Sequence, residues 1–324
     1  MARTGVLLLG FGGPDSIESV EPFMCNLMGK QPSPELVMRI CGNYEAIGGA
    51  SPLADIAARF ARALEADLAS LGHEAPVRVG MRYWHPYIDD TIESLRELGC
   101  EQIVTVSLSP FESKVTSGAY REAIAEALGE GSSVEVVEAP LISGLSAFAD
   151  FYVESTRRAL AAVPRGTRSV VAFTAHSLPV SDLVDDDPYV AGLTRTAEAV
   201  AAGLCLAPGV PDAGPPALPT FAALGSGDAD RPWFLVFQSK GARPGAWLGP
   251  ALDELIAASA EAGYGAVVVS PIGFVTDHME TLFDLDVVAA NSAVDAGMVF
   301  TRAAVPNEDP GLVSALAKAV APLI

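Results

Sequence analysis

Apolar runs of strand length alternate with segments of helical periodicity along the whole chain. The runs are apolar at nearly every position, which is typical of strands buried on both faces of a parallel sheet. Between them, apolar residues recur every three or four positions, most regularly in 53–71, and this predicts helices. The predicted strands are 5–11, 77–82, 102–108, 134–138, 169–174, 233–238, 266–270 and 298–302. The predicted helices are 17–28, 34–46, 53–71, 88–98, 120–128, 147–162, 189–204, 249–262, 278–290 and 312–321.

This alternation predicts an α/β fold with two similar Rossmann-like lobes, each a parallel sheet flanked by helices. Each half of the chain holds about four of the predicted strands. The segment 139–144 contains Pro140 and Gly144 and is a plausible boundary. We therefore expect an N-terminal lobe over 1–143 and a C-terminal lobe over 144–324. The Pro- and Gly-rich segment 206–232 is expected to be a loop.

Composition and charge narrow the class of protein. Half of the 324 residues are hydrophobic, yet the apolar runs are much shorter than the roughly 18 residues of a membrane span. The first run is followed by Gly12, Gly13 and Pro14, which suits a strand and turn better than a signal-peptide cleavage site. A net charge of −20 disfavours nucleic acid and anionic membranes as partners. We expect a soluble, cytoplasmic, monomeric protein with no integral membrane segment.

One predicted strand ends in the sequence His176-Ser177-Leu178-Pro179. Pro179 prevents a simple continuation of the strand, so His176 is expected at its carboxyl end. Ligands bind at that edge of open α/β sheets. A core histidine with both ring nitrogens hydrogen-bonded explains this stretch about as well.

The second informative stretch is SPIGFVTDHMETLFDLD, residues 270–286, which follows another predicted strand. Asp277 and Glu280 have the spacing of a capping box, which would be a purely structural role. In an α-helix, Asp277, Glu280 and Asp284 would also share one face, where their charges repel unless a cation or solvent offsets them. If the strands are parallel, His176 and Glu280 emerge at the same sheet edge. An imidazole and a carboxylate suit a divalent first-row metal such as Fe²⁺, with coordination positions left open for substrate.

These stretches resemble the two most characteristic motifs of the ferrochelatase family. They are FTAHSLP at 173–179 and PIGFVTDHMETLFDLD at 271–286. Counterparts also exist for LLLGFGGP (7–14), NYEAIGGASPLADI (43–56), SGAYREAI (117–124) and FQSKGARPGAWLGP (237–250). The resemblance implies a chelatase-like fold, with a porphyrin cleft between two lobes, and an enzyme that inserts Fe²⁺ into a porphyrin with release of two pyrrole protons.

The resemblance also implies roles for individual residues. His176 matches the family's active-site histidine and Glu280 its partner carboxylate, so both are expected to be catalytic and to contact the metal. Ser51 and Tyr120 match positions that contact the macrocycle or its propionates. Whether His176 acts mainly as base or mainly as ligand stays open.

The chain departs from the family pattern at several positions. Phe11 replaces a tyrosine that many members carry, Asn43 replaces a common arginine, and Val288 stands where the acidic row often has a further member. No cysteine follows Cys205, so the [2Fe–2S] cluster of some relatives is not expected. The resemblance therefore implies no cofactor beyond the substrate Fe²⁺.

The GFGGP turn and the lack of an apolar anchor resemble a soluble bacterial branch associated with coproporphyrin III. We therefore expect coproporphyrin III as the porphyrin, giving Fe-coproporphyrin III in haem biosynthesis. Three alternatives stay open: protoporphyrin IX as substrate, a related cobalt chelatase, against which Glu280 argues, and a non-catalytic tetrapyrrole-binding protein.

Overall fold

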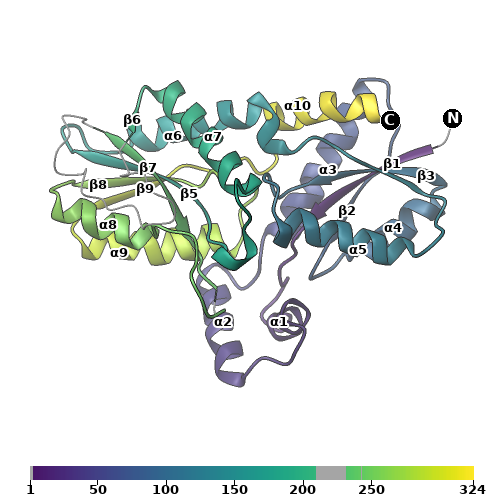
Figure 1. The fold of residues 1–324 in the computed structure, drawn as a ribbon, viewed down its shortest axis with the longest axis horizontal. Coiled ribbons are helices and arrows are strands. Elements are labelled where there is room, and N and C mark those ends of the chain that lie inside the picture. Colours follow the sequence, from purple (N-terminus) through teal and green to yellow (C-terminus); the bar gives the residue numbers. More distant parts are fainter. Residues whose placement is uncertain (1–2, 209–230, 242) are drawn as a thin grey trace. The chain divides into compact units, whose positions relative to one another are not determined.

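The computed structural model describes residues 3–208, 231–241 and 243–324 (Figure 1). Contacts within the chain divide it into two compact units. Unit 1 comprises Met1–Phe148, Val275–Met279 and Pro306–Ile324, and unit 2 comprises Ala149–Phe274 and Glu280–Val305. Within the described part of the chain, no helix combines the length and apolarity that a membrane span requires.

Unit 1 is built on a four-stranded parallel sheet of order β2-β1-β3-β4. Its strands are β1 (Arg3–Gly10), β2 (Val77–Met81), β3 (Cys100–Ser107) and β4 (Glu135–Glu138). Its helices are α1 (Val20–Met28), α2 (Pro34–Ala46), α3 (Leu53–Ser70), α4 (Ile88–Glu97), η1 (Lys114–Gly118), α5 (Ala119–Leu128), η2 (Ile142–Gly144), α10 (Pro310–Val320) and η6 (Ala321–Leu323). The apolar faces of α4 and α5 cover β1, where Leu7 and Leu9 pack against Ile92 and Tyr120 in one buried cluster.

Unit 2 is built on a five-stranded parallel sheet of order β6-β7-β5-β8-β9. Its strands are β5 (Ser169–His176), β6 (Ala207–Pro208), β7 (Pro232–Gln238), β8 (Ala266–Ser270) and β9 (Val299–Arg302). Its helices are α6 (Ser146–Ala161), which starts in unit 1, η3 (Val180–Asp182), α7 (Pro188–Leu204), α8 (Leu252–Glu261), η5 (Glu280–Ala289) and α9 (Ala290–Asp295). The central strand β5 is buried at every position up to Ala175, and its apolar run at 170–173 predicts this burial.

The α/β fold with two parallel sheets is confirmed, and some element details differ. The first helix begins at Val20 rather than at Ile17. The helix expected over 278–290 is a π-helix from Glu280 to Ala289 that continues into α9. The short edge strand β6 was not predicted. Most of the expected loop, 209–230, lies outside the described residues.

The units also differ from the expected contiguous lobes 1–143 and 144–324. The division falls after Phe148, and the C-terminal helix α10 belongs to unit 1. This helix packs on α3, and an ion pair of 2.6 Å joins Arg59 of α3 to Glu308 just before α10. Sequence rhythm orders elements along the chain, so it could not show that the chain returns to its first unit.

Candidate active site

The carboxyl end of β5 carries an imidazole paired with a carboxylate. His176 is the last residue of β5, and its Nδ1 atom lies 3.0 Å from Oε2 of Glu280, the first residue of η5. The His176 side chain is 33% exposed and the Glu280 side chain 31% exposed. The Nε2 atom of His176 makes no hydrogen bond with the described residues. The pair is thus fixed through one ring nitrogen, while the other remains available.

The backbone on both sides of this pair is held in place. The Tyr189 hydroxyl donates a hydrogen bond of 2.8 Å to the His176 carbonyl. In the segment that leads to η5, the Tyr152 hydroxyl donates to the carbonyls of Pro271 and Phe274, at 2.7 Å each. Gly273 lies so close to β5 that a Cβ atom there would stand 2.6 Å from the Cβ atom of Ala175. The glycine of the PIGF stretch is therefore required by packing against the strand that carries His176.

A π-helix presents Glu280 and Asp284. Its i→i+5 hydrogen bonding widens the turn, so residues four to five apart share a face. The side chain of Gln238, the last residue of β7, donates a hydrogen bond of 2.8 Å to the Glu280 carbonyl. The hydroxyl of Ser239, the next residue, donates one to the Asp284 carboxylate. Two consecutive residues at the end of β7 thus anchor both acidic positions of η5.

The expected three-carboxylate stripe is corrected by this geometry. Asp277 precedes the helix and is paired with Asn307 in unit 1, whose side chain accepts from the Asp277 N–H at 2.8 Å and donates to its carboxylate at 3.0 Å. The i, i+3, i+7 pattern assumes an α-helix, and η5 neither includes Asp277 nor has α-helical spacing. The acidic residues that η5 places near His176 are therefore Glu280 and Asp284.

The pKa values of His176 and Asp284 are both raised at this site, for different reasons. Burial lowers the pKa of His176, but the charge and hydrogen bond of Glu280, with Asp284 beyond it, outweigh burial and raise the pKa above its ordinary value. Burial raises the pKa of Asp284 to about 6, and the Glu280 charge adds to the rise, while the Ser239 hydrogen bond and His176 oppose it. The His176 imidazole is thus a stronger proton acceptor than an ordinary histidine, and Asp284 retains its proton to higher pH than an ordinary aspartate.

Three supporting residues, Gln238, Ser239 and Tyr189, were not predicted from the sequence. A sequence signal existed for two of them, because Gln238 ends a strand that is hydrogen-bonded to β5 and Ser239 follows it directly. The carboxyl-end rule applied to β5 applies equally to β7. Tyr189 gave no such signal, since it lies in the first turn of a helix.

In unit 1, Ser51 is buried, and its hydrogen bonds join it to nearby backbone groups. Its N–H donates to the Pro14 carbonyl at 2.8 Å, and its Oγ accepts from the Leu53 N–H at 3.3 Å, ahead of α3. A Cβ atom at Gly13 would stand 2.6 Å from this Oγ. The turn after β1 and the start of α3 therefore meet at Ser51. The expected contact of Ser51 with a porphyrin stays a prediction.

Tyr120 is a core residue, 2% exposed, and its hydroxyl lies 3.3 Å from the Ser109 Oγ. Burial raises the pKa of this phenol to about 12. The ring lines a cavity of about 380 Å³ between α5 and the strands β3 and β4, together with Thr105, Ile124 and Val136. Its predicted contact with a porphyrin stays a prediction as well.

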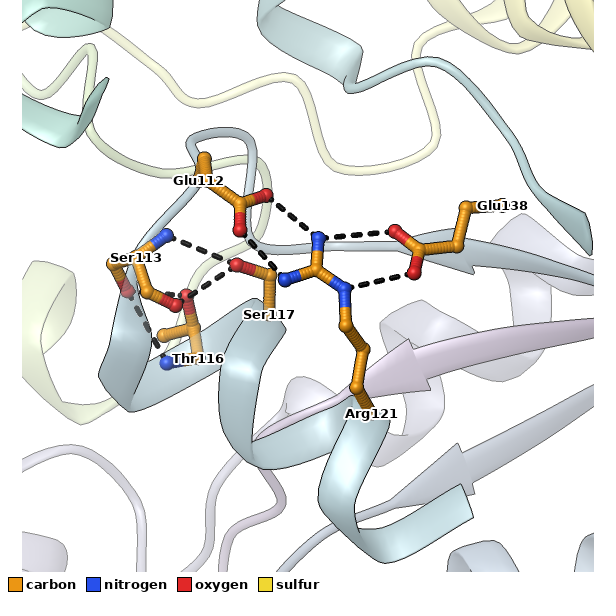
Figure 2. Close-up of polar contacts among 6 residues, drawn as sticks. All are labelled: Glu112, Ser113, Thr116, Ser117, Arg121 and Glu138. Carbon is orange, nitrogen blue, oxygen red and sulfur yellow. Dashed lines mark hydrogen bonds and ion pairs between the residues drawn. The ribbon is translucent and has the colours of Figure 1, made fainter. Parts of the chain in front are cut away.

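Arg121, the residue after Tyr120, joins α5 to the segment before η1 and to the end of β4. Figure 2 shows the Arg121 guanidinium held by two carboxylates, Glu112 before η1 and Glu138 at the end of β4. All four of its hydrogen bonds lie between 2.7 and 3.0 Å. Beside them, the Ser113 Oγ accepts from the Thr116 N–H, and the Ser117 hydroxyl donates to the Ser113 carbonyl. Glu112 is thus held by α5, and Ser113, the next residue, by η1.

Phe11, one of the positions that depart from the expected pattern, packs against an aromatic ring. Phe11 follows β1, and its ring centroid is 4.7 Å from that of Tyr83. In the part of the chain that the structure describes, no group of three or more histidine, cysteine, aspartate or glutamate side chains is placed to hold a metal ion together. The candidate ligands are the His176–Glu280 pair of unit 2, with Asp284 one turn further along η5.

The fold is chelatase-like. SirB from Bacillus subtilis, solved with Fe³⁺, has a TM-score of 0.55 at 14% identity, covering 98% of this chain and 94% of that one. CbiX, described as the terminal enzyme of sirohaem biosynthesis in denitrifying bacteria, has a TM-score of 0.51 at 12% identity, covering 99% of both chains. At these identities the likeness shows the fold alone.

Sequence comparison then gives the family. A family profile described as Ferrochelatase matches residues 3–322. A protein named ferrochelatase from Herpetosiphon aurantiacus is 31% identical over 320 residues, 97% of each chain. Proteins named coproporphyrin III ferrochelatase from Mycolicibacterium vanbaalenii and Halalkalibacterium halodurans are 32% and 30% identical, covering 96% and 98% of this chain and 87% and 96% of theirs. The chain therefore belongs to the ferrochelatase family, a family of enzymes that insert iron into porphyrins.

Proposed function

We propose that this protein inserts Fe²⁺ into coproporphyrin III, with His176 and Glu280 acting on the metal and on the pyrrole protons. The observation that carries the proposal is the 3.0 Å pairing of these side chains at the carboxyl end of the central strand β5. A free porphyrin holds two N–H protons where the metal must go, so insertion needs a proton acceptor beside a metal-binding group. An imidazole whose partner carboxylate is one-third exposed provides both.

The imidazole is suited to accept a pyrrole proton at Nε2. Glu280 at Nδ1 stabilises the resulting positive charge, which is the reason that the pKa of His176 is raised. The same neutral imidazole and the carboxylate are ligand types that divalent iron accepts. Asp284, one turn away, offers a further oxygen through which Fe²⁺ could exchange its waters in steps.

The choice of porphyrin rests on the relatives' names and on the GFGGP turn. Coproporphyrin III is named for the Mycolicibacterium and Halalkalibacterium relatives, whereas the Herpetosiphon relative is named ferrochelatase without a porphyrin. Ser51 and Tyr120 would take part in binding the macrocycle or its propionates. The cytoplasmic location, the monomeric state, the lack of a nucleic-acid partner and the lack of an iron–sulfur cluster remain predictions from the sequence.

The deciding experiment is an anaerobic insertion assay followed by ultraviolet–visible absorbance. Coproporphyrin III and protoporphyrin IX are compared at equal Fe²⁺ and detergent concentrations. We expect kcat/KM for coproporphyrin III to be well above that for protoporphyrin IX. An equal or reversed preference would contradict the choice of porphyrin. Binding of either porphyrin without turnover would support a tetrapyrrole-binding protein instead.

A further inference from the structure

The side chain of Gln238 has one end fixed and one end without a partner. It is 7% exposed and stands opposite His176 in the β5–β7 register. Its Nε2 atom donates to the Glu280 carbonyl, at 2.8 Å. Its Oε1 atom is buried and has no hydrogen-bond partner among the described residues. Such an oxygen is uncommon, because it has lost its hydration and gained nothing in exchange.

The orientation of this amide follows from its neighbour. Amide oxygen and nitrogen are not distinguished by shape, but a backbone carbonyl can only accept. The nitrogen must therefore face the Glu280 carbonyl, which leaves the oxygen as an acceptor without a partner, on a residue that stands opposite His176 and holds the Glu280 backbone. What this oxygen lacks is a donor that the described protein does not supply.

A water molecule bound to a divalent cation is such a donor. The cation polarises its waters and makes their O–H groups more acidic than those of bulk water. A neutral amide oxygen accepts this hydrogen bond without adding charge, so it orients the hydrated ion but does not hold it permanently. This suits an ion that is to be passed on.

We propose that Gln238 is a positioning residue for the incoming metal. Its donor end holds the first turn of η5, and with it Glu280, while its acceptor end takes a hydrogen bond from a water molecule carried by the cation. Ser239, the next residue, fixes Asp284 in the same way from the same strand end. The inference rests on the proposed function in one respect, namely that the cation is the one to be inserted.

The test uses the whole chain with Gln238→Met, which keeps the side-chain length and removes both amide functions. Gln238→Asn is the second variant, because it keeps a polar amide in the buried position but is one methylene shorter. The matched control is Gln102→Met on β3 of unit 1, where the amide oxygen accepts a hydrogen bond of 2.7 Å from the Thr4 hydroxyl. Circular dichroism selects the variants that fold.

Two readouts are measured. The first is the affinity for Co²⁺ in the absence of porphyrin, by titration calorimetry and the visible spectrum of the ion. The second is the pair of KM values for Fe²⁺ and for porphyrin. Loss of a residue that orients metal ligands typically costs about 10- to 100-fold in metal affinity or activity. We expect a loss of that size in Co²⁺ affinity and a matching rise in the KM for Fe²⁺, with the KM for porphyrin within about twofold of the wild type.

The outcomes separate the inference from the function on which it rests. Unchanged Co²⁺ affinity in both Gln238 variants would overturn the inference, as would equal rises in both KM values, which indicate a general structural defect. Absence of Co²⁺ binding by the wild type would overturn it too. If the wild type inserts no metal but the Gln238 variants alone lose Co²⁺ affinity, the proposed function fails and the positioning role stands.

Discussion

The hydroxyl of Ser239 donates a hydrogen bond to the carboxylate of Asp284, and this contact joins the end of β7 to η5 one turn beyond Glu280. It keeps an acidic side chain in a partly buried place beside another carboxylate. Burial and the Glu280 charge raise the pKa of Asp284 from 3.8 to about 6 even though Ser239 opposes the rise. Ionisation of Asp284 therefore costs stability in the folded protein.

Replacing Asp284 with Asn should stabilise the metal-free protein above pH 6. The raised pKa means that the folded state holds the Asp284 proton more tightly than the unfolded state, so the stability it contributes is complete below pH 4 and is lost as the pH rises through about 6. Asn cannot ionise and still accepts from Ser239. We expect the free energy of unfolding of the variant to exceed that of the wild type by about 2 kcal/mol at pH 7.5.

The measurement is urea unfolding between pH 4.5 and pH 8 with a chelator present. Asp295→Asn at the exposed end of α9 is the matched control. A difference between Asp284→Asn and wild type that stays constant over this range would show that the Asp284 charge is not the cause.

His176→Ala and Glu280→Gln should each lower kcat/KM for insertion by about 100-fold or more, the range of general acid–base catalysis. Porphyrin binding, followed by absorbance, should persist. Because the Glu280 charge raises the pKa of His176, Glu280→Gln should also lower that pKa, measured by NMR titration of the four histidines.

His73→Ala, in the loop before β2 of unit 1, is the control for loss of a histidine. Near-normal turnover in both His176→Ala and Glu280→Gln would refute the catalytic assignment. If instead the two variants failed to fold, a structural role for the pair would be favoured.

Gly13→Ala should destabilise the protein, because the new Cβ atom would stand 2.6 Å from the Ser51 Oγ and 2.7 Å from its Cβ. The turn after β1 and the start of α3 would have to move apart, at a cost of about 1–3 kcal/mol. Gly42→Ala is the matched control, since Gly42 is exposed within α2 and a Cβ atom there meets nothing within 4 Å. That control should be neutral or stabilising by up to about 1 kcal/mol. Equal thermal midpoints for the two variants would contradict the close approach of Gly13 and Ser51.

Arg121→Gln should reduce the free energy of unfolding by about 1 kcal/mol, since the paired groups are partly exposed. Arg121 holds the pKa of Glu112 below its ordinary value, so this stability is present above pH 4.5 and is lost as the pH falls further. The difference from wild type should therefore be largest near neutrality and shrink in acid and in salt. Arg96→Gln, which breaks an exposed i, i+3 pair with Glu93, is the control and should have less effect. Equal losses for both arginines at pH 7 would indicate that the four hydrogen bonds in Figure 2 act as an ordinary surface pair.

The local sequence pattern was enough to predict the buried strands, the place of His176 and the family. The uninterrupted apolar run of β5 predicted a strand buried on both faces, and Pro179 placed His176 at the strand's end. Both follow from backbone geometry and burial, which act over a few residues. The motifs around 173–179 and 271–286 sufficed for the family.

Only the tertiary structure decided the rest. The π-helical spacing of η5 separates Asp277 from the acidic pair, and the side chains that hold this pair, Gln238 and Ser239, lie about forty residues earlier in the chain. The return of α10 to unit 1 depends on its packing against α3. Hydrogen bonds and packing between residues distant in sequence have no periodicity that a sequence can display. For that reason Gln238, whose partner is a carbonyl group common to every residue, became visible only in the folded chain.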